Sequence, residues 1–312
     1  MRASVLALLP LAYRGVDGSV AYLFTLRRER HPLPNVWSTY FEGCPKQSFS
    51  VHTHVEMNST HVTKPNVGQL PTRFSAGRIG TSIHVERFQY SMVKVRYLLL
   101  HAAFQVGNPE WFIFLSDSCA PLVSCRSAHA YLNAHKGRSF LGPDGTEPSG
   151  ADQMATAERA KYAEAFHRVC PKCATVGVEP QHYLHTAGWF GVWREHAQLL
   201  LDKEREHDEA MRDWVGVRDL PGIPDETHWG TLFTRYQLPM WGRLLTFMLR
   251  GSAKGGHPRI FQSQDIGLVE NETAKEAAKD GEKLKYLFAR KFATTHEVDI
   301  KLRTRIAAGN GF

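Results

Sequence analysis

Trp111-Phe-Ile-Phe-Leu115 is a run of five consecutive apolar residues in a chain of 312. A strand with one face in water alternates apolar and polar residues, so this unbroken run predicts a strand buried on both faces. Such strands are typical of the middle of a parallel sheet that helices cover on each side. The stretch therefore predicts an α/β fold with a mostly parallel central sheet.

The segments around this strand alternate between strand and helix patterns, which is typical of an α/β protein. Strands are predicted at Val20–Thr25, Ser48–Val55, Leu244–Leu249 and Leu284–Phe292, and helices at Pro34–Phe41, Ser91–Phe104, 128–134, 152–168, 194–206 and from Asp225 onward. Residues 57–80 are predicted to form a loop region with at most one short strand, and residues 142–150 a loop. No repeat or long linker interrupts the pattern, so residues 19–308 are predicted to form a single domain, followed by a tail at 309–312.

The bulk composition is that of a globular protein, with 43% hydrophobic and 22% charged residues. A net charge of +7 is compatible with an anionic partner, but the Lys and Arg residues are scattered. Nucleic acid is therefore not a predicted partner, because its binding needs a contiguous cationic face.

The five cysteines include Cys170-Pro-Lys-Cys173. This lone CxxC predicts a local disulfide or two thiols rather than zinc, for which His167 and His182 are the nearest further ligands.

The N-terminal residues 1–18 combine a cation with a short apolar run, which fits a signal or anchor remnant or a first buried strand. No apolar run reaches the ~20 residues that a bilayer-spanning helix needs, so membrane association is expected only through an N-terminal anchor. Asn58-Ser-Thr60 and Asn271-Glu-Thr273 are N-glycosylation acceptors if the chain enters the secretory route.

Two segments carry the chemistry of a group transfer. Pro224-Asp-Glu-Thr-His-Trp229 begins a predicted helix with two carboxylates, and Leu284–Phe292 ends in the adjacent cations Arg290 and Lys291. A carboxylate can accept a proton from a hydroxyl, and cations at a sheet edge can hold an anionic leaving group. Together they are the minimum apparatus for sugar transfer from a nucleotide donor.

Several segments resemble the core-2/I-branching β-1,6-N-acetylglucosaminyltransferases of glycosyltransferase family 14, especially their plant-type branch. The matching segments follow the family's order along the chain. They are Tyr22–Thr25 with Pro34–Phe41, Val51–Glu56, Ser91-Met-Val93, Trp111–Leu122 with its Ser-Asp-Ser-Cys-Ala-Pro-Leu turn, Ala187–Arg194, Pro224-Asp-Glu226, Gly256–Phe261 and Leu287–Phe292. Two departures concern donor-base contacts and substrate choice: Arg87 and Phe88 replace the family's Trp-Gly, and Asp117 replaces its Glu.

The resemblance implies a GT-A-type glycosyltransferase fold and an inverting, metal-independent reaction. The expected donor is a UDP-sugar, carrying N-acetylglucosamine or xylose, and the expected acceptor is a hydroxyl on a glycan or glycoprotein. No cofactor and no divalent metal are expected, and the sequence contains no Asp-x-Asp motif. The family's usual place is the Golgi lumen.

The resemblance also assigns roles to particular residues. Glu226 is expected to be the catalytic base, and a structural role at the helix start is the alternative. Its neighbour Asp225 is the better cap and is also a candidate substrate-binding residue. Lys291 and Arg259 are expected to hold the diphosphate, with Arg290 able to replace either; surface cations or structural ion pairs are the alternatives.

Further candidates for the donor and acceptor sites follow the predicted strands. His54 and Glu56, at the carboxyl end of a strand, lie where open α/β sheets bind nucleotides, although His54 is equally well read as a structural histidine. Ser116 and Asp117 are candidates for the donor pocket, and Cys119 is expected to be buried. Trp189 is a candidate for stacking on an acceptor sugar or for the core.

One alternative from another functional class stays open. It is a catalytically inactive relative of the same fold that binds glycans or nucleotide sugars. A decayed site would be expected to lose Glu226 and Lys291, and the sequence keeps both.

Overall fold

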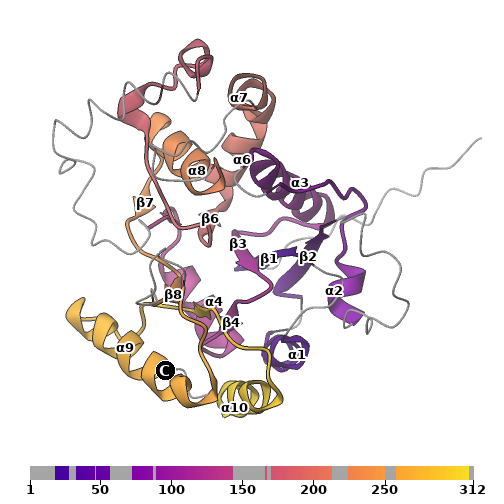
Figure 1. Ribbon diagram of the computed structural model, residues 1–312, viewed down its shortest axis with the longest axis vertical. Helices are drawn as coiled ribbons and strands as arrows, with labels where there is room; N and C mark the ends of the chain where they lie inside the picture. Colours follow the sequence, from indigo (N-terminus) through magenta and orange to yellow (C-terminus); the bar gives the residue numbers. More distant parts are fainter. Residues whose placement is uncertain are drawn as a thin grey trace, which may run out of the picture.

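The structure is a computed structural model that describes residues 18–27, 33–45, 47–56, 72–86, 89–142, 166, 170–212, 224–249 and 258–308. Its elements form a central sheet with helices on both sides (Figure 1). The predicted N-terminal segment up to residue 17 and the tail at 309–312 lie outside the described residues, as do 143–150 and most of the predicted helix at 152–168.

The main sheet has the strand order β2-β1-β3-β6-β5-β7. The strands are β1 (Val20–Leu26), β2 (Phe49–Val55), β3 (Trp111–Ser116), β5 (Ser139–Phe140), β6 (Gly191–Trp193) and β7 (Met240–Trp241). β1 pairs in parallel with β2 and β3, and β5 pairs in parallel with β7. β6 lies antiparallel between β3 and β5. The mostly parallel sheet predicted from the sequence is confirmed.

Strand β3 is buried along its whole length, as its apolar run predicted. Trp111, Ile113 and Leu115 pack into the core on one face of the sheet. Phe112 and Phe114 pack into the core on the other face. Burying a large apolar side chain contributes about 1.5–3 kcal/mol, so this strand anchors both halves of the molecule.

Helices supply the other half of each core (Figure 1). On the face of Trp111 they are α1 (Pro34–Glu42), α2 (Thr72–Ala76), α4 (Cys125–Ala134), α9 (Ile266–Lys279) and α10 (His296–Ala307). On the face of Phe112 they are α3 (Ser91–Val106), α6 (Arg194–Asp202), α7 (Glu204–Met211) and α8 (Pro224–Arg235). Short 3-10 turns occur at Cys173–Val176, Pro180–His182 and Ser263–Asp265.

A second, small sheet packs against the first core in the order β4-β9-β8. Its strands are β4 (Ala120–Pro121), β8 (Thr246–Met248) and β9 (Phe288–Arg290). The strands predicted at Leu244–Leu249 and Leu284–Phe292 therefore exist, but in this sheet and over three residues each. Because β4 directly follows the turn after β3, the pairing of Ala120 with Ala289 brings the Arg290 end of β9 to that turn.

Two element predictions need correction. The loop predicted at 57–80 contains helix α2, and Arg78 forms a bridge with Thr53 that extends the edge of β2; residues 57–71 lie outside the described residues. The single helix predicted at 194–206 breaks at Lys203 into α6 and α7. The polar surface pattern continues through Lys203, so the sequence carries no signal for this break.

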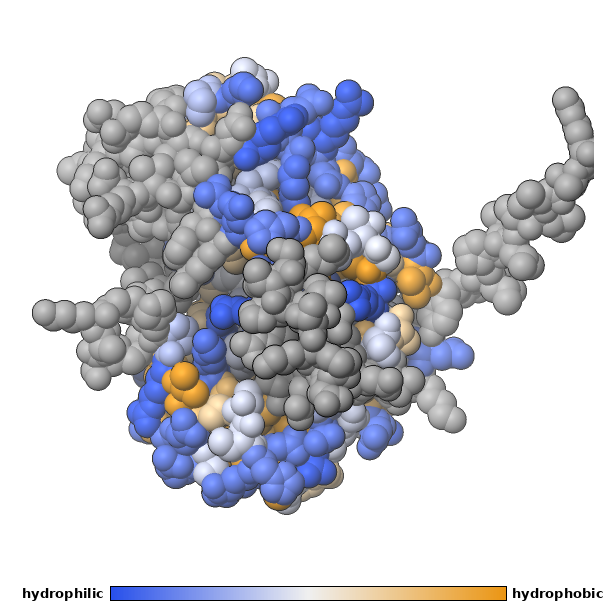
Figure 2. All heavy atoms as spheres, turned by 45° about the vertical axis from the view of Figure 1, so that its right-hand side comes forward, coloured by the Kyte–Doolittle hydropathy of each residue, from blue (hydrophilic) through white to orange (hydrophobic). Residues whose placement is uncertain are grey.

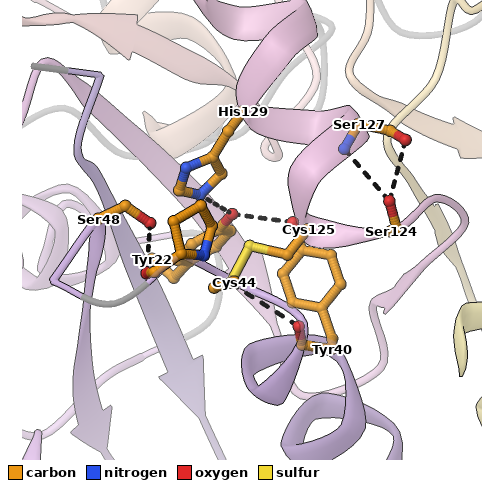
Figure 3. Close-up of a disulfide and its surroundings, with 9 residues drawn as sticks. Tyr22, Tyr40, Cys44, Ser48, Ser124, Cys125, Ser127 and His129 are labelled. Atoms are coloured by element: carbon orange, nitrogen blue, oxygen red, sulfur yellow. Dashed lines mark hydrogen bonds between the residues drawn. A yellow bond between two sulfur atoms is a disulfide. The ribbon is translucent and has the colours of Figure 1, made fainter. Parts of the chain in front are cut away.

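Two disulfides are present. Cys44 at the end of α1 bonds Cys125 at the start of α4, beside the buried ring of Tyr22 and the imidazole of His129 (Figure 3). Cys170 bonds Cys173, which agrees with the predicted local disulfide and removes both sulfurs as zinc ligands. Cys119 is a free thiol and is fully buried, as expected.

The surface of the described residues is largely hydrophilic on the face shown in Figure 2, where apolar side chains form small scattered spots. The large apolar side chains that are most exposed are Val106, Ile260 and Ile300. Among the described helices, none combines the length and the apolar character that crossing a bilayer requires.

Candidate active site

The carboxyl edge of the parallel strands brings two predicted donor-site residues into one row. His54 of β2 and Ser116 of β3 each pair with Thr25 of β1, which lies between them. Neighbouring strands lie about 4.8 Å apart, so the two residues are about 10 Å from each other across the sheet. This is the edge at which open α/β sheets bind nucleotides.

His54 is fully buried and held by the backbone. The Ile83 N–H donates a hydrogen bond to its Nε2 over 3.1 Å. Burial, with a contribution from Arg78, lowers the pKa of His54 to about 4. The imidazole is therefore neutral near pH 7 and anchors the segment that carries Ile83. Its neighbour Glu56, just past the strand, has a half-buried side chain.

The turn after β3 presents small polar groups. Ser116 and Ser118 are buried and their hydroxyls lie 3.1 Å apart. Asp117 between them is half-buried. The Phe292 N–H donates to the Ser118 carbonyl, which fixes this turn against the segment that follows β9. The turn and the end of β9 thus form one structural unit.

Glu226 lies in the first turn of α8, which begins with Pro224 at a position where its missing N–H costs no hydrogen bond. Its side chain is 30% exposed, and its Oε2 lies 3.2 Å from Nε2 of His185. A carboxylate in the first turn is stabilised by the positive end of the helix dipole. Glu226 is thus anchored at its backbone, and its side chain is half-buried.

Asp225 lies beside Glu226 but is 3% exposed. Its Oδ2 accepts a hydrogen bond of 2.7 Å from the guanidinium of Arg96, a residue of α3 that is also buried. Arg96 also donates to the carbonyls of Asp225 and Gly188. Burial raises the pKa of the Asp225 carboxyl, and Arg96 opposes that rise. Asp225, the candidate cap and substrate-binding residue, forms a buried ion pair with Arg96 in the first turn of α8.

The segment at 184–188 lies along the first two turns of α8. The Thr186 N–H donates to the Glu226 carbonyl over 2.6 Å, and the Leu184 N–H donates to the Thr231 hydroxyl over 3.3 Å. At Gly188 a Cβ atom would lie 3.1 Å from an Arg96 nitrogen, tighter than most contacts. Glycine at this position lets the backbone approach the Arg96–Asp225 pair closely.

Trp189 connects the carboxylate side of the site to the cationic side. Its half-buried ring lies 4.6 Å from the guanidinium carbon of Arg290 and 6.0 Å from that of Arg96. These separations are those of cation–π contacts. Trp189 therefore packs against protein cations, and Arg290 covers part of the ring that was a candidate for stacking on a sugar.

The other predicted cations lie near Arg290 but differ in their surroundings. Lys291 is half-buried, and its carbonyl accepts a hydrogen bond of 2.7 Å from the Phe261 N–H. Arg259 bonds through its backbone N–H to Leu249, which follows β8, and its guanidinium pairs with Asp265 at 2.5 Å. The structure thus brings Arg290 and Lys291 to the site edge and holds Arg259 in an ion pair.

The described residues contain one close grouping of potential metal-ligand atoms, from Cys44, Cys125 and His129. Its two sulfurs form the disulfide of Figure 3, and His129 bonds the Tyr22 hydroxyl over 3.2 Å. This grouping is therefore structural. At the carboxyl edge, Asp117 stands between Ser116 and Ser118.

Three residues of the site were not found from the sequence. Arg96 is 129 positions from Asp225, and His185 is 41 positions from Glu226. The third is Gly188, where a Cβ atom would lie 3.1 Å from an Arg96 nitrogen. A cation inside the predicted helix Ser91–Phe104, on a face otherwise occupied by apolar residues, was the one available signal for Arg96.

Sequence comparison shows the family directly. Residues 20–272 match the profile described as "Branch: Core-2/I-Branching enzyme". The chain therefore belongs to the Core-2/I-branching enzyme family, a family of glycosyltransferases, as the motif resemblance indicated. The match includes His54, Ser116, Trp189, Asp225 and Glu226, whereas β9 with Arg290 lies beyond its end.

A curated relative agrees with this assignment. The chain is 25% identical over 247 residues to "Glycosyltransferase BC10" of Oryza sativa subsp. japonica, covering 71% of this chain and 54% of the relative. It thus spans about half the length of that relative.

Two solved structures show a weak likeness. The glycosyltransferase GlyE of Streptococcus pneumoniae TIGR4 is 11% identical, with a TM-score of 0.35 and 91% of this chain and 60% of that chain covered. The glucosyl-3-phosphoglycerate synthase of Mycobacterium tuberculosis, crystallised with Mn2+, UDP-glucose and phosphoglyceric acid, is 12% identical, with a TM-score of 0.29 and coverage of 77% and 86%. Scores this low carry no inference about function.

Proposed function

We propose that this protein is an inverting glycosyltransferase that moves a sugar from a UDP-sugar to a hydroxyl of a glycan or glycoprotein acceptor, without a divalent metal. The observation that carries the proposal is the position of Trp189. Its neighbour Gly188 lies against Glu226, and its ring lies against Arg290. A proton acceptor and a cation thus flank one short segment, as a displacement reaction at a sugar carbon requires.

Glu226 is the base in this proposal. As the acceptor oxygen bonds to the anomeric carbon, its proton passes to the Glu226 carboxylate, and the bond from that carbon to the diphosphate breaks on the opposite face. The electron pair leaves with UDP. Arg96 and Asp225 do not take part in proton transfer, because their buried pairing occupies them. They fix the helix turn from which Glu226 projects.

Arg290 and Lys291 stabilise the leaving diphosphate. The Nε of Arg290 is buried and has no hydrogen-bond partner within the described residues, which leaves a donor available to an anionic oxygen. Arginine binds phosphate oxygens through paired N–H groups, and lysine acts as a compact point charge. Arg259 would join them only after leaving Asp265, so its contribution is secondary.

The nucleoside part of the donor is assigned to the edge formed by His54, Glu56, Ser116 and Asp117. Neutral His54 serves there mainly as a support, since the Ile83 N–H occupies its Nε2. N-acetylglucosamine or xylose is the proposed sugar. A Golgi location is proposed as well, and the two disulfides support it because such bonds persist in oxidising compartments.

The test is UDP release from a panel of UDP-sugars in the presence of EDTA, with glycan acceptors added. The proposal predicts EDTA-resistant release with one donor, and a product whose anomeric configuration, read by NMR, is inverted. Turnover that EDTA abolishes and added metal restores would contradict the metal-independent mechanism. Binding of a UDP-sugar without turnover with any acceptor would favour the inactive binding relative.

A further inference from the structure

We propose that His185 is a positioning residue for the base, holding one oxygen of Glu226 so that the other faces the acceptor. This inference rests on the proposed function of Glu226 and adds a residue to it. His185 Nε2 lies 3.2 Å from Glu226 Oε2, and the two side chains are 27% and 30% exposed. Both side chains are therefore partly accessible to solvent, as contact with an acceptor requires.

The backbone on both sides of His185 is tied to the helix that carries Glu226. Before it, the Leu184 N–H donates to the hydroxyl of Thr231, and after it, the Thr186 N–H donates to the carbonyl of Glu226 itself. Thr186 is fully buried. His185 is thus a side chain between two fixed neighbours, which restricts where its imidazole can lie.

The chemistry of the pair fixes the direction of the hydrogen bond. An ionised carboxylate has only acceptors, so Nε2 of His185 must carry the hydrogen. A hydrogen bond to a carboxylate is charge-assisted and directional. With Oε2 occupied by His185, Oε1 of Glu226 is the oxygen left to receive a proton.

In the transfer step the acceptor O–H bond breaks and a bond forms between that hydrogen and Glu226 Oε1. The acceptor oxygen bonds the anomeric carbon as UDP leaves with the electron pair. His185 keeps its own proton throughout. Its effect is on the orientation of the carboxylate, and displacement of a reacting group by about 1 Å can cost 10²-fold in rate.

The experiment compares His185→Ala, which removes the hydrogen bond, with His185→Gln, whose amide nitrogen can donate from a similar position. We expect kcat to fall about tenfold or more in His185→Ala with little change in KM for the donor, and to recover to within about threefold of wild type in His185→Gln. A merely structural histidine would not be rescued in kcat alone.

A matched control is His101→Ala. His101 makes the same type of contact, from Nε2 to the carboxylate of Glu204, but joins α3 to α7 away from the site. Thermal melting of each variant checks that it is folded. His185→Ala with wild-type kcat overturns the inference, and so does failure of His185→Gln to recover kcat while folded.

The Glu226→Gln variant tests the proposed base independently of the role of His185. If Glu226→Gln abolishes turnover and the His185 variants behave as wild type, only the role of His185 fails. If Glu226→Gln turns over normally, the proposed base fails, and His185 with it.

Discussion

Neighbouring residues of the same chemical type have different environments in this site. Asp225 and Glu226 are consecutive carboxylates, yet Asp225 is buried against Arg96 and Glu226 is partly exposed to solvent. A buried ion pair is a weak source of net stability, but removing one partner typically costs 3–5 kcal/mol. We therefore interpret the Arg96–Asp225 pair as the fixed support of the site and Glu226 as its reactive group.

The role assigned to Arg290 predicts how a single substitution changes the affinity for UDP. Arg290→Gln removes the charge that we assign to the diphosphate, and a hydrogen bond to a charged group contributes about 1.5–3 kcal/mol. We expect the Kd of UDP, measured by calorimetry in EDTA, to rise at least about tenfold.

Arg138→Gln is the control for this prediction. Arg138 is exposed, and its guanidinium carbon lies 4.7 Å from the ring of Trp241, so it makes the same kind of aromatic contact without an assigned role. Its substitution should leave UDP affinity unchanged. Equal affinities of Arg290→Gln and wild type for UDP would show that Arg290 does not bind the diphosphate.

The sequence predicted the secondary-structure elements better than the contacts between residues that lie far apart in the chain. The apolar run Trp111–Leu115 identified the central strand because burial on both faces leaves a local pattern. Pro224-Asp-Glu226 was singled out by its paired carboxylates at a predicted helix start, and the Ser-Asp-Ser turn by family resemblance; both lie at the candidate site. The pairing of Arg96 with Asp225 joins residues 129 positions apart, and no local pattern encodes such a contact.

The two disulfides differ in loop length, and this predicts different contributions to the free energy of unfolding. The Cys44–Cys125 disulfide has a sequence separation of 81, whereas Cys170–Cys173 has a separation of 3. The chain-entropy relation assigns about 4.5 kcal/mol to closing the longer loop and about 1–2 kcal/mol to the shorter. We expect Cys44→Ser/Cys125→Ser to lower the free energy of unfolding more than Cys170→Ser/Cys173→Ser does.

Denaturant unfolding of the two double variants measures this difference. The pair of variants is its own control, because each removes one disulfide and adds two hydroxyls. Equal losses would mean that local packing around the sulfurs, rather than loop closure between α1 and α4, determines the effect.

At the scale of the whole molecule, buried histidines link folding to pH. Burial lowers the pKa values of His52, His54, His129 and His207 to about 4, from 6.5 in an exposed histidine. Below pH 6.5 the unfolded chain binds protons that the folded chain does not, until the pH reaches about 4. The free energy of unfolding should therefore be greatest above pH 6.5 and fall as the pH drops from 6.5 to 4.

The size of this effect is measurable. Each unit by which a pKa differs between the folded and unfolded chain corresponds to about 1.4 kcal/mol, and total stabilities are about 5–15 kcal/mol. Urea unfolding followed by circular dichroism at pH 7.5, 6 and 5 should show a midpoint that decreases at each step. A midpoint independent of pH over this range would show that these histidines are protonated alike in both states.

The central claim is that Glu226 is the base of a metal-independent sugar transfer. Its most direct measurement is kcat in EDTA for Glu226→Gln beside Glu195→Gln, since Glu195 is an exposed acid in the first turn of α6. General base catalysis contributes 10²–10⁴-fold, so we predict a loss of about that size in Glu226→Gln, unchanged donor binding, and wild-type kcat in Glu195→Gln. Wild-type kcat in a folded Glu226→Gln would contradict the account.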